Sequence, residues 1–223
     1  MYHIAIRQFW FITFVVSLFF SFELKAARQE GPRTSTMRVT QVYVDLPNIR
    51  IWVDARDTKG RFVGNLQKKN FQASVGRDIL SLNKALPPKL HEDGIAYVVL
   101  LDTSSSMKGR PFRTLQKITR KIIKKLRPRD RMALVSFGKN IVIRSNFTAN
   151  RRVLLESLRK IRPNEPLTKL YQAIRYGLRM LKRRGNSFPK RRAILVVSDG
   201  QDEGSGLTLE DLIGEHTEIA API

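Results

Sequence analysis

The chain contains no cysteine, which removes several classes of chemistry at once. Without thiols it cannot form disulfides, bind zinc through thiolates, use a cysteine nucleophile or carry a lipid anchor on cysteine. Histidine is nearly as scarce, because only His3, His91 and His216 occur and they have no ligand spacing. Neither a zinc site nor a Ser-His-Asp triad is therefore expected.

Acidic residues are also few, and they are unevenly placed. Lys and Arg number 41 against 19 Asp and Glu, which gives a net charge of +22. Lys and Arg are concentrated in the segment from Lys108 to Arg131, where Asp130 is the one acid. From Ala193 onward the sequence has no Lys or Arg. This asymmetry has two interpretations: a solvated surface that keeps the protein soluble, or a face that attracts anionic partners.

No uncharged run is long enough for an ordinary membrane-spanning helix. The run from Phe9 to Phe22 has fourteen residues, follows Arg7, and has the length of a signal-peptide apolar region. Leu24-Lys25-Ala26 offers a cleavage site after Ala26. We predict that residues 1–26 are a signal peptide, with an uncleaved signal anchor as the alternative. The remainder is then extracytoplasmic: secreted, periplasmic, or membrane-anchored and facing out.

Residues 37–86 show the alternation of half-buried strands. Ile49, Ile51, Val53 and Ala55 alternate with more polar residues before a turn at residues 57–60. This pattern predicts a small antiparallel β-sandwich module. Residues 87–94, which begin with Pro87-Pro88, have the composition of a linker.

Residues 95–223 predict an α/β fold with a doubly wound, mostly parallel sheet. The continuous apolar runs Ile95–Leu101 and Ala193–Val197 are typical of strands buried on both faces. Residues 132–137 and 141–143 should form a hairpin at the sheet edge. Three apolar stripes at helical spacing predict core-facing helices. Their members are Leu115, Ile118, Ile122 and Leu126; Leu154, Leu158 and Ile161; and Leu170, Ile174, Gly177, Leu178 and Leu181.

Polar side chains follow both apolar runs directly. Asp102, with Ser104 and Ser106 beside it, comes after the first run, and Ser198-Asp199 comes after the second. The carboxyl ends of parallel strands meet at one rim of the sheet, where α/β proteins bind ligands. Carboxylate and hydroxyl oxygens without nitrogen or sulfur suit Mg²⁺, Mn²⁺ or Ca²⁺.

Asp102-x-Ser104-x-Ser106, Thr168 before a helix, and Asp199-Gly200 after a strand together resemble the von Willebrand factor type A domain. The match is to its metal-ion-dependent adhesion site. The resemblance implies a divalent cation, Mg²⁺ or else Mn²⁺ or Ca²⁺, with a coordination position open to a carboxylate from a protein partner. The implied metal residues are Asp102, Ser104, Ser106, Thr168 and Asp199. Leu167 stands where the family usually has glycine.

The resemblance extends to domain organisation. The spacing of Asp57, Gly60, Val63, Leu66 and Asn70-Phe71 is similar to the immunoglobulin-like module that precedes this domain in some exported bacterial proteins. The family fold continues for another strand, helix and strand, so we expect the domain to be incomplete at its C-terminus. The implied function is adhesion or assembly through protein–protein interaction.

Three alternatives remain open at this stage. Asp102 and its serines could cap the helix that starts near Pro111, or hold a turn together by hydrogen bonds. An enzyme would need a second carboxylate or a base at the site. The position two residues after Asp102, where a second carboxylate would be needed, is occupied by Ser104. Asp202 and Glu203 are the acids that could approach the rim. We therefore expect no catalysis. A basic module that binds an anionic polymer (nucleic acid, glycan or membrane surface) is the alternative function.

Overall fold

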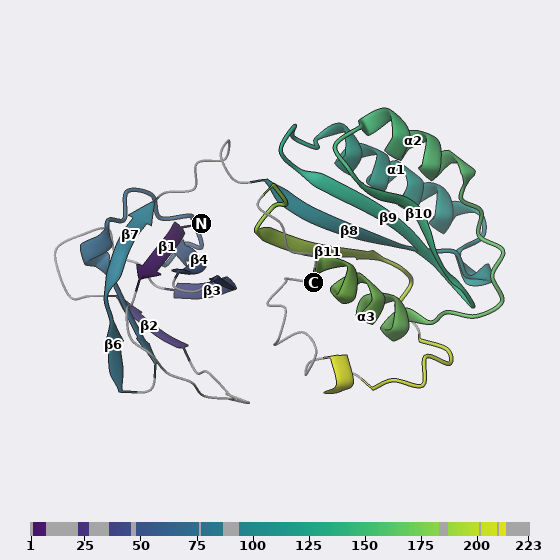
Figure 1. Ribbon diagram of the computed structural model, residues 1–223. Coiled ribbons are helices and arrows are strands. Elements are labelled where there is room, and N and C mark those ends of the chain that lie inside the picture. Colours follow the sequence, from purple (N-terminus) through teal and green to yellow (C-terminus); the bar gives the residue numbers. More distant parts are fainter. Residues whose placement is uncertain are drawn as a thin grey trace. The chain divides into compact units, whose positions relative to one another are not determined.

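The computed structural model describes residues 2–7, 22–26, 36–45, 48–75, 77–86, 94–182, 187–200, 202–208 and 210–212. The chain divides into two compact units, Met1–Leu90 and His91–Ile223, each of which is considered by itself (Figure 1). Within the described ranges, no helix has both the length and the hydropathy needed to cross a membrane. The uncharged run from Phe9 lies outside those ranges up to Phe22, where a strand begins.

The first unit consists of two antiparallel sheets. One has the order β3 (Thr36–Asp45), β4 (Asn48–Arg56), β1 (Tyr2–Arg7), β7 (Leu82–Leu86), and the other has the order β2 (Phe22–Ala26), β5 (Phe71–Val75), β6 (Asp78–Leu80). As the alternation predicts, Ile51, Val53 and Ala55 are fully buried. Trp52, on the opposite side of the same strand, is only 3% exposed, so β4 is covered on both faces rather than one.

Strands β1 and β2 come from the segment predicted as a signal peptide. β1 lies between two partners, with His3 opposite both Trp52 of β4 and Leu86 of β7. β2 pairs with β5, with Leu24 opposite Ala73. Both sheets therefore include a strand from the first 26 residues of the chain.

The second unit is built on one four-stranded sheet. Its order is β10 (Ile141–Thr148), β9 (Arg131–Phe137), β8 (Ile95–Asp102), β11 (Arg191–Val197). β8 is parallel to both of its neighbours, whereas β10 is antiparallel to β9 at the edge. The predicted mostly parallel sheet and its edge hairpin are both confirmed.

Helices cover both faces of this sheet (Figure 1). α1 (Arg110–Lys124) and α2 (Arg151–Lys160) pack on one face, over Val99, Leu101 and Met132. α3 (Leu170–Leu181) packs on the other, over Val98 and Leu100. Successive residues of β8 thus enter opposite cores, which explains why this strand is apolar at nearly every position before Asp102. At Gly177 of α3 a Cβ would lie 3.3 Å from Ile194 and from Val98, so glycine lets the helix approach the sheet closely.

The predicted apolar stripe of α1 is wrong in part. The helix buries Phe112, Leu115, Thr119 and Ile123, whereas Ile118 is 44% exposed. Thr119 can lie in the core because its hydroxyl donates a hydrogen bond to the Leu115 carbonyl at 2.9 Å. A buried threonine is not visible to a pattern that counts only apolar residues. The helix also ends at Lys124, ahead of Pro128.

Asp130 ties together the starts of the two central strands. Its Oδ1 accepts a hydrogen bond from Ile95 N at 2.9 Å, and Arg127 donates to the carboxylate from its backbone and its guanidinium. Burial by itself would raise the pKa of this carboxyl. The hydrogen bonds and charge of Arg127, with the bond from Ile95, outweigh that effect and hold the pKa below its ordinary value.

Candidate functional site

The site begins where β8 ends. Asp102 is fully buried, and each of its oxygens accepts one hydrogen bond: Oδ1 from Ser104 N at 2.8 Å and Oδ2 from Ser198 Oγ at 2.6 Å. Ser198 can reach Asp102 because β11 runs parallel to β8 with Val197 opposite Leu101. The strand pairing therefore brings two loops together that are far apart in the sequence.

Two hydroxyls and a second carboxylate lie next to Asp102. Ser104 Oγ and Ser106 Oγ are 2.9 Å apart, and Ser106 Oγ donates to Asp199 Oδ2 at 2.6 Å. A short 3-10 turn, Ser105–Met107, holds Ser106 at the surface while Met107 is buried. Three oxygen-bearing side chains from the two loops thus form one hydrogen-bonded cluster.

A third loop lies against the first. Glu165 N donates to the Thr103 carbonyl at 3.0 Å, and Ser105 N donates to the Glu165 carbonyl at 2.8 Å. Thr168, which follows in this loop, is 2% exposed. Within the described part of the chain, no hydrogen bond joins its side chain to the cluster. The loop that carries Thr168 is therefore adjacent to the site, with Leu167 at the position where the family usually has glycine.

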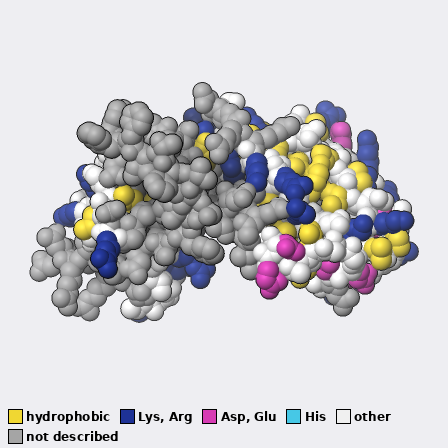
Figure 2. All heavy atoms as spheres, turned by 60° about the horizontal axis from the view of Figure 1, so that its bottom comes forward, with side chains coloured by type: hydrophobic (Ala, Val, Ile, Leu, Met, Phe, Trp, Pro, Cys, Tyr) yellow, Lys and Arg dark blue, Asp and Glu magenta, His cyan; other side chains and the backbone are white. Residues whose placement is uncertain are grey.

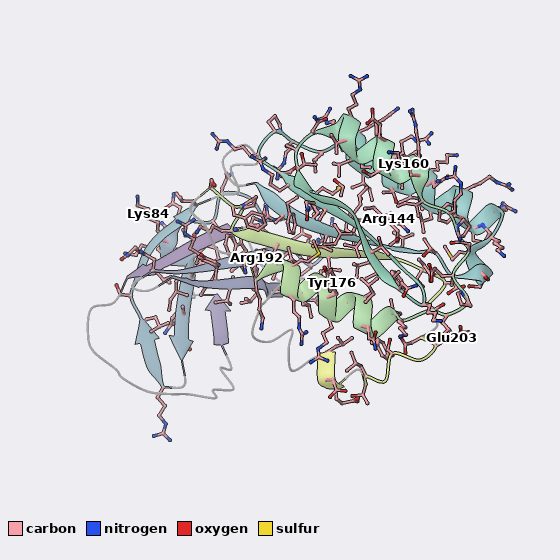
Figure 3. All side chains as sticks on the ribbon, turned by 45° about the vertical axis from the view of Figure 1, so that its right-hand side comes forward. Lys84, Arg144, Lys160, Tyr176, Arg192 and Glu203 are labelled. Atoms are coloured by element: carbon pink, nitrogen blue, oxygen red, sulfur yellow. The ribbon has the colours of Figure 1, made fainter. Side chains whose placement is uncertain are left out.

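Asp202 has a role that the sequence analysis missed. Its Oδ1 accepts a hydrogen bond from Tyr171 N in the first turn of α3 at 3.0 Å, and from the Ser205 hydroxyl. α3 needs such a partner because Lys169, at its N-cap, makes no side-chain cap. The bond spans 31 residues, so no local pattern could have revealed it. Glu203 donates its backbone N–H to the Thr168 carbonyl at 2.6 Å, and its exposed side chain marks this loop in Figure 3.

The capping alternative can be examined directly. The N-cap of α1 is Gly109, which has no side-chain cap, so neither Asp102 nor its serines cap this helix. The turn alternative describes part of what is seen, since Asp102 does accept the Ser104 backbone N–H. A hydrogen-bonded turn by itself gives the Asp102 carboxylate no positively charged partner. Among the described residues, no Lys or Arg forms an ion pair with Asp102 or Asp199. A buried carboxylate without a counter-charge is costly.

The donor set can be compared with what a hard cation requires. Among the described residues, no three His, Cys, Asp or Glu side chains cluster as a metal site. A cation here would thus depend on hydroxyls as well as on the two aspartates. Neighbouring ligands of an octahedral Mg²⁺ at 2.0–2.1 Å lie roughly 2.9 Å from one another. The Ser104–Ser106 separation matches that value, and the Ser106–Asp199 separation would have to widen by roughly 0.3 Å.

Comparisons with known proteins bear on the second unit. Residues 97–201 match the model of the von Willebrand factor type A domain. No curated protein matches the chain. Similar solved structures include the vWF domain of the type V pili tip protein Mfa5 from Porphyromonas gingivalis, at 21% identity and a TM-score of 0.45, covering 53% of this chain and 43% of that one. The conserved hypothetical protein BatB from Bacteroides thetaiotaomicron is 18% identical with a TM-score of 0.41, covering 48% of this chain and 57% of that one.

The matched segment runs from β8 to just beyond β11, and all five predicted metal residues lie within it. This chain covers less than two thirds of each of the two similar structures. Domains of this family generally mediate protein interactions. Residues 97–201 of this chain therefore form a von Willebrand factor type A domain.

Proposed function

We propose that the protein is an exported, non-enzymatic interaction module that binds a protein partner through a divalent cation. The residues that would hold the cation are Asp102, Ser104, Ser106, Thr168 and Asp199. When bound, the cation supplies positive charge and an open position for a carboxylate oxygen of the partner. Export is supported by the uncharged run from Phe9 to Phe22.

One observation carries the proposal. The fully buried Asp102 lies beside three clustered oxygens, those of Ser104, Ser106 and Asp199, with no cationic partner among the described side chains. A divalent cation would offset the charge of both aspartates and would accept the hydroxyl oxygens without needing nitrogen ligands. Ser106 and Asp199 are exposed, so a ligand could reach the cluster from solvent.

The absence of catalysis is part of the proposal because, in the part of the chain that the structure describes, no histidine lies at the cluster to activate a bound water. Asp202 is one of the two acids, with Glu203, that the sequence analysis expected could approach the rim. Its Oδ1 accepts a hydrogen bond from Tyr171 N in the first turn of α3, and its Oδ2 accepts one from Ser205 N in its own loop. A carboxylate used in this way supports the helix rather than the chemistry of hydrolysis.

Thermal unfolding of the full chain in Mg²⁺ or Mn²⁺, compared with EDTA, tests the metal site. A ligand that binds only the folded state stabilises it by roughly 2.7 kcal/mol at a hundred times its Kd. We expect the melting temperature to rise, and Asp102→Ala to abolish the rise. Since Asp102→Ala removes a buried group and could prevent folding, Ser106→Ala at the surface is the safer variant.

Ser105→Ala is the matched control, because the Ser105 hydroxyl donates to the Glu165 carbonyl and not to the cluster. It should keep the response to Mg²⁺ that Ser106→Ala loses. A wild-type melting temperature that is the same in Mg²⁺, Mn²⁺ and EDTA would show that the serines and aspartates form only a hydrogen-bonded turn. Retention of a protein ligand in Mg²⁺ and its release by EDTA would extend the test to the partner.

A further inference from the structure

The face of the α/β unit formed by α1 and α2 carries a dense set of cations. Along α1, Lys117, Lys121 and Lys124 recur at the spacing of one helix side, and all three are exposed. They lie opposite the buried side chains of Phe112, Leu115, Thr119 and Ile123. The row therefore points away from the sheet, and it extends roughly 10 Å along the helix.

α2 enlarges the same face. It packs beside α1, where Gln116 Nε2 donates to the Leu158 carbonyl at 3.4 Å. Its exposed cations include Arg152, Arg159 and Lys160, and nitrogen-tipped side chains project outward from this side of the unit around Lys160 in Figure 3. Within the two helices the one acid is Glu156, which pairs with Arg152 at 3.4 Å.

Most acids of this unit lie away from α1 and α2. After β11 the exposed side chains of Asp199, Glu203, Glu210 and Asp211 follow one another with no basic residue between them. In the view of Figure 2, most of the visible carboxylates of this unit lie together on one part of its surface. Apart from Arg152, which pairs with Glu156, the exposed cations named on α1 and α2 form no ion pair within these two helices. Like charges held this close repel each other unless an anionic partner covers them.

The other side chains on the face indicate which anion fits. Ile118 and Val153 are 44% and 42% exposed on the same two helices. Phe112, the aromatic residue of α1, is buried, so α1 and α2 offer no exposed ring for stacking of nucleic acid bases. Cations interspersed with aliphatic side chains on a helical surface suit a membrane interface, where phosphate groups lie in a plane above an apolar layer.

We propose that the α1–α2 face binds the surface of a membrane that contains anionic lipid. Each lysine or arginine near such a surface contributes about 1 kcal/mol, or roughly a fivefold change in partitioning. Several such contributions from one rigid face suffice for measurable binding without an inserted helix. The proposed membrane surface is separate from the metal site, so either can fail without the other.

Sedimentation of the full chain with vesicles tests this proposal. Vesicles of phosphatidylcholine alone are compared with vesicles that also contain phosphatidylglycerol. The apolar N-terminal run should contribute equally to binding of both kinds, so the difference between them measures the contribution of the cations. The test variant is Lys117→Gln with Lys121→Gln and Lys124→Gln, since glutamine keeps the helix propensity of lysine. Binding to the anionic vesicles should fall roughly a hundredfold, and binding to the neutral vesicles should not change.

The matched control changes the net charge equally on the other unit: Lys59→Gln, Lys68→Gln and Lys69→Gln, all at exposed positions. It should bind anionic vesicles nearly as well as the wild type. Equal losses in the two triple variants, or equal wild-type binding to both kinds of vesicle, would overturn the proposal. So would duplex DNA binding that the α1 variant loses while its vesicle binding is unchanged, because the face would then be a nucleic-acid surface.

Discussion

Gly138 provides a sharp test of how the site loops are packed. It follows β9 and lies directly against the third loop of the site. A Cβ at this position would lie 2.2 Å from Glu165 Cβ, 2.6 Å from Glu165 Cγ and 3.1 Å from the Leu167 carbonyl oxygen. The Gly138 carbonyl also accepts Lys169 N at 3.1 Å, so the two segments cannot simply separate. Gly138→Ala should therefore displace the loop that carries Thr168.

The expected size follows from the overlap. Forcing one methyl group into a closely packed contact costs roughly 1 to 3 kcal/mol. For a domain of this size, that should lower the midpoint of thermal unfolding by roughly 3 to 10 °C. The displaced loop pairs through Glu165 with Thr103 and Ser105, so any stabilisation by Mg²⁺ should weaken as well.

The assay is thermal unfolding of single and double variants. Gly64→Ala is the control, because a Cβ there would meet nothing within 4 Å and should change stability by less than about 1 kcal/mol. In the Gly138→Ala variant, the new methyl group would clash with Glu165 Cβ, and Glu165→Gly removes that atom. The Glu165→Gly substitution alone should lower the free energy of unfolding by roughly 0.5 to 1 kcal/mol. The double variant should then be less destabilised than the sum of the single variants, by roughly 1 kcal/mol or more.

Two results would refute this reasoning. If Gly138→Ala were as stable as Gly64→Ala, the close approach of the two segments would not exist in solution. If the effects of Gly138→Ala and Glu165→Gly were simply additive, the cost would come from a source other than the contact between these residues.

Three further predictions concern Asp130, Asp202 and the N-terminus. Hydrogen bonds and the charge of Arg127 hold the pKa of Asp130 below its ordinary value. The stabilisation that Asp130 provides should therefore be present at pH values above that ordinary pKa and be lost as the pH falls through the lower folded-state pKa. Asp130→Asn should lower the free energy of unfolding at neutral pH and flatten its dependence on acid pH in urea titrations. Asp202→Ala should cost about 1 kcal/mol by uncapping α3, whereas Glu203→Ala, an exposed neighbour, should cost much less in the same unfolding assay; equal effects would contradict the capping role. When the chain is made in a bacterial host, intact mass and N-terminal sequencing of the extracytoplasmic fraction should show removal of residues 1–26. A mature chain that still begins at Met1 and sediments with membranes would indicate a signal anchor.

The sheet of the α/β unit could be predicted because its central strands are buried on both faces. Ile95–Leu101 is apolar at nearly every position for that reason, and the ends of adjacent parallel strands necessarily meet, which placed Asp102 near Asp199. The same logic extended to Ser104 and Ser106, which follow Asp102 within one turn. These predictions needed only local composition and a rule of sheet geometry.

Other features depend on contacts that the sequence does not encode locally. Thr119 can lie in the core because its hydroxyl donates a hydrogen bond to the Leu115 carbonyl. The buried side of α1 therefore includes Thr119 rather than Ile118, which the apolar pattern had predicted to be buried. Asp202 caps α3 by accepting a hydrogen bond from Tyr171 N, which lies 31 residues earlier in the chain. Trp52 is buried by contacts on the second face of β4, which strand alternation does not predict. β1 and β2 lie within a segment whose composition indicates a leader.

The hydrogen bonds of the site have a consequence for the order of events in folding. Ser106 meets Asp199 across 93 residues and Ser198 meets Asp102 across 96, and both contacts require β11 to be in place beside β8. Parallel pairing over such a separation forms slowly, because the intervening chain must be closed first. The site must therefore assemble after the β8–β9 core. A ligand bound across both loops would then slow unfolding and leave the folding rate unchanged.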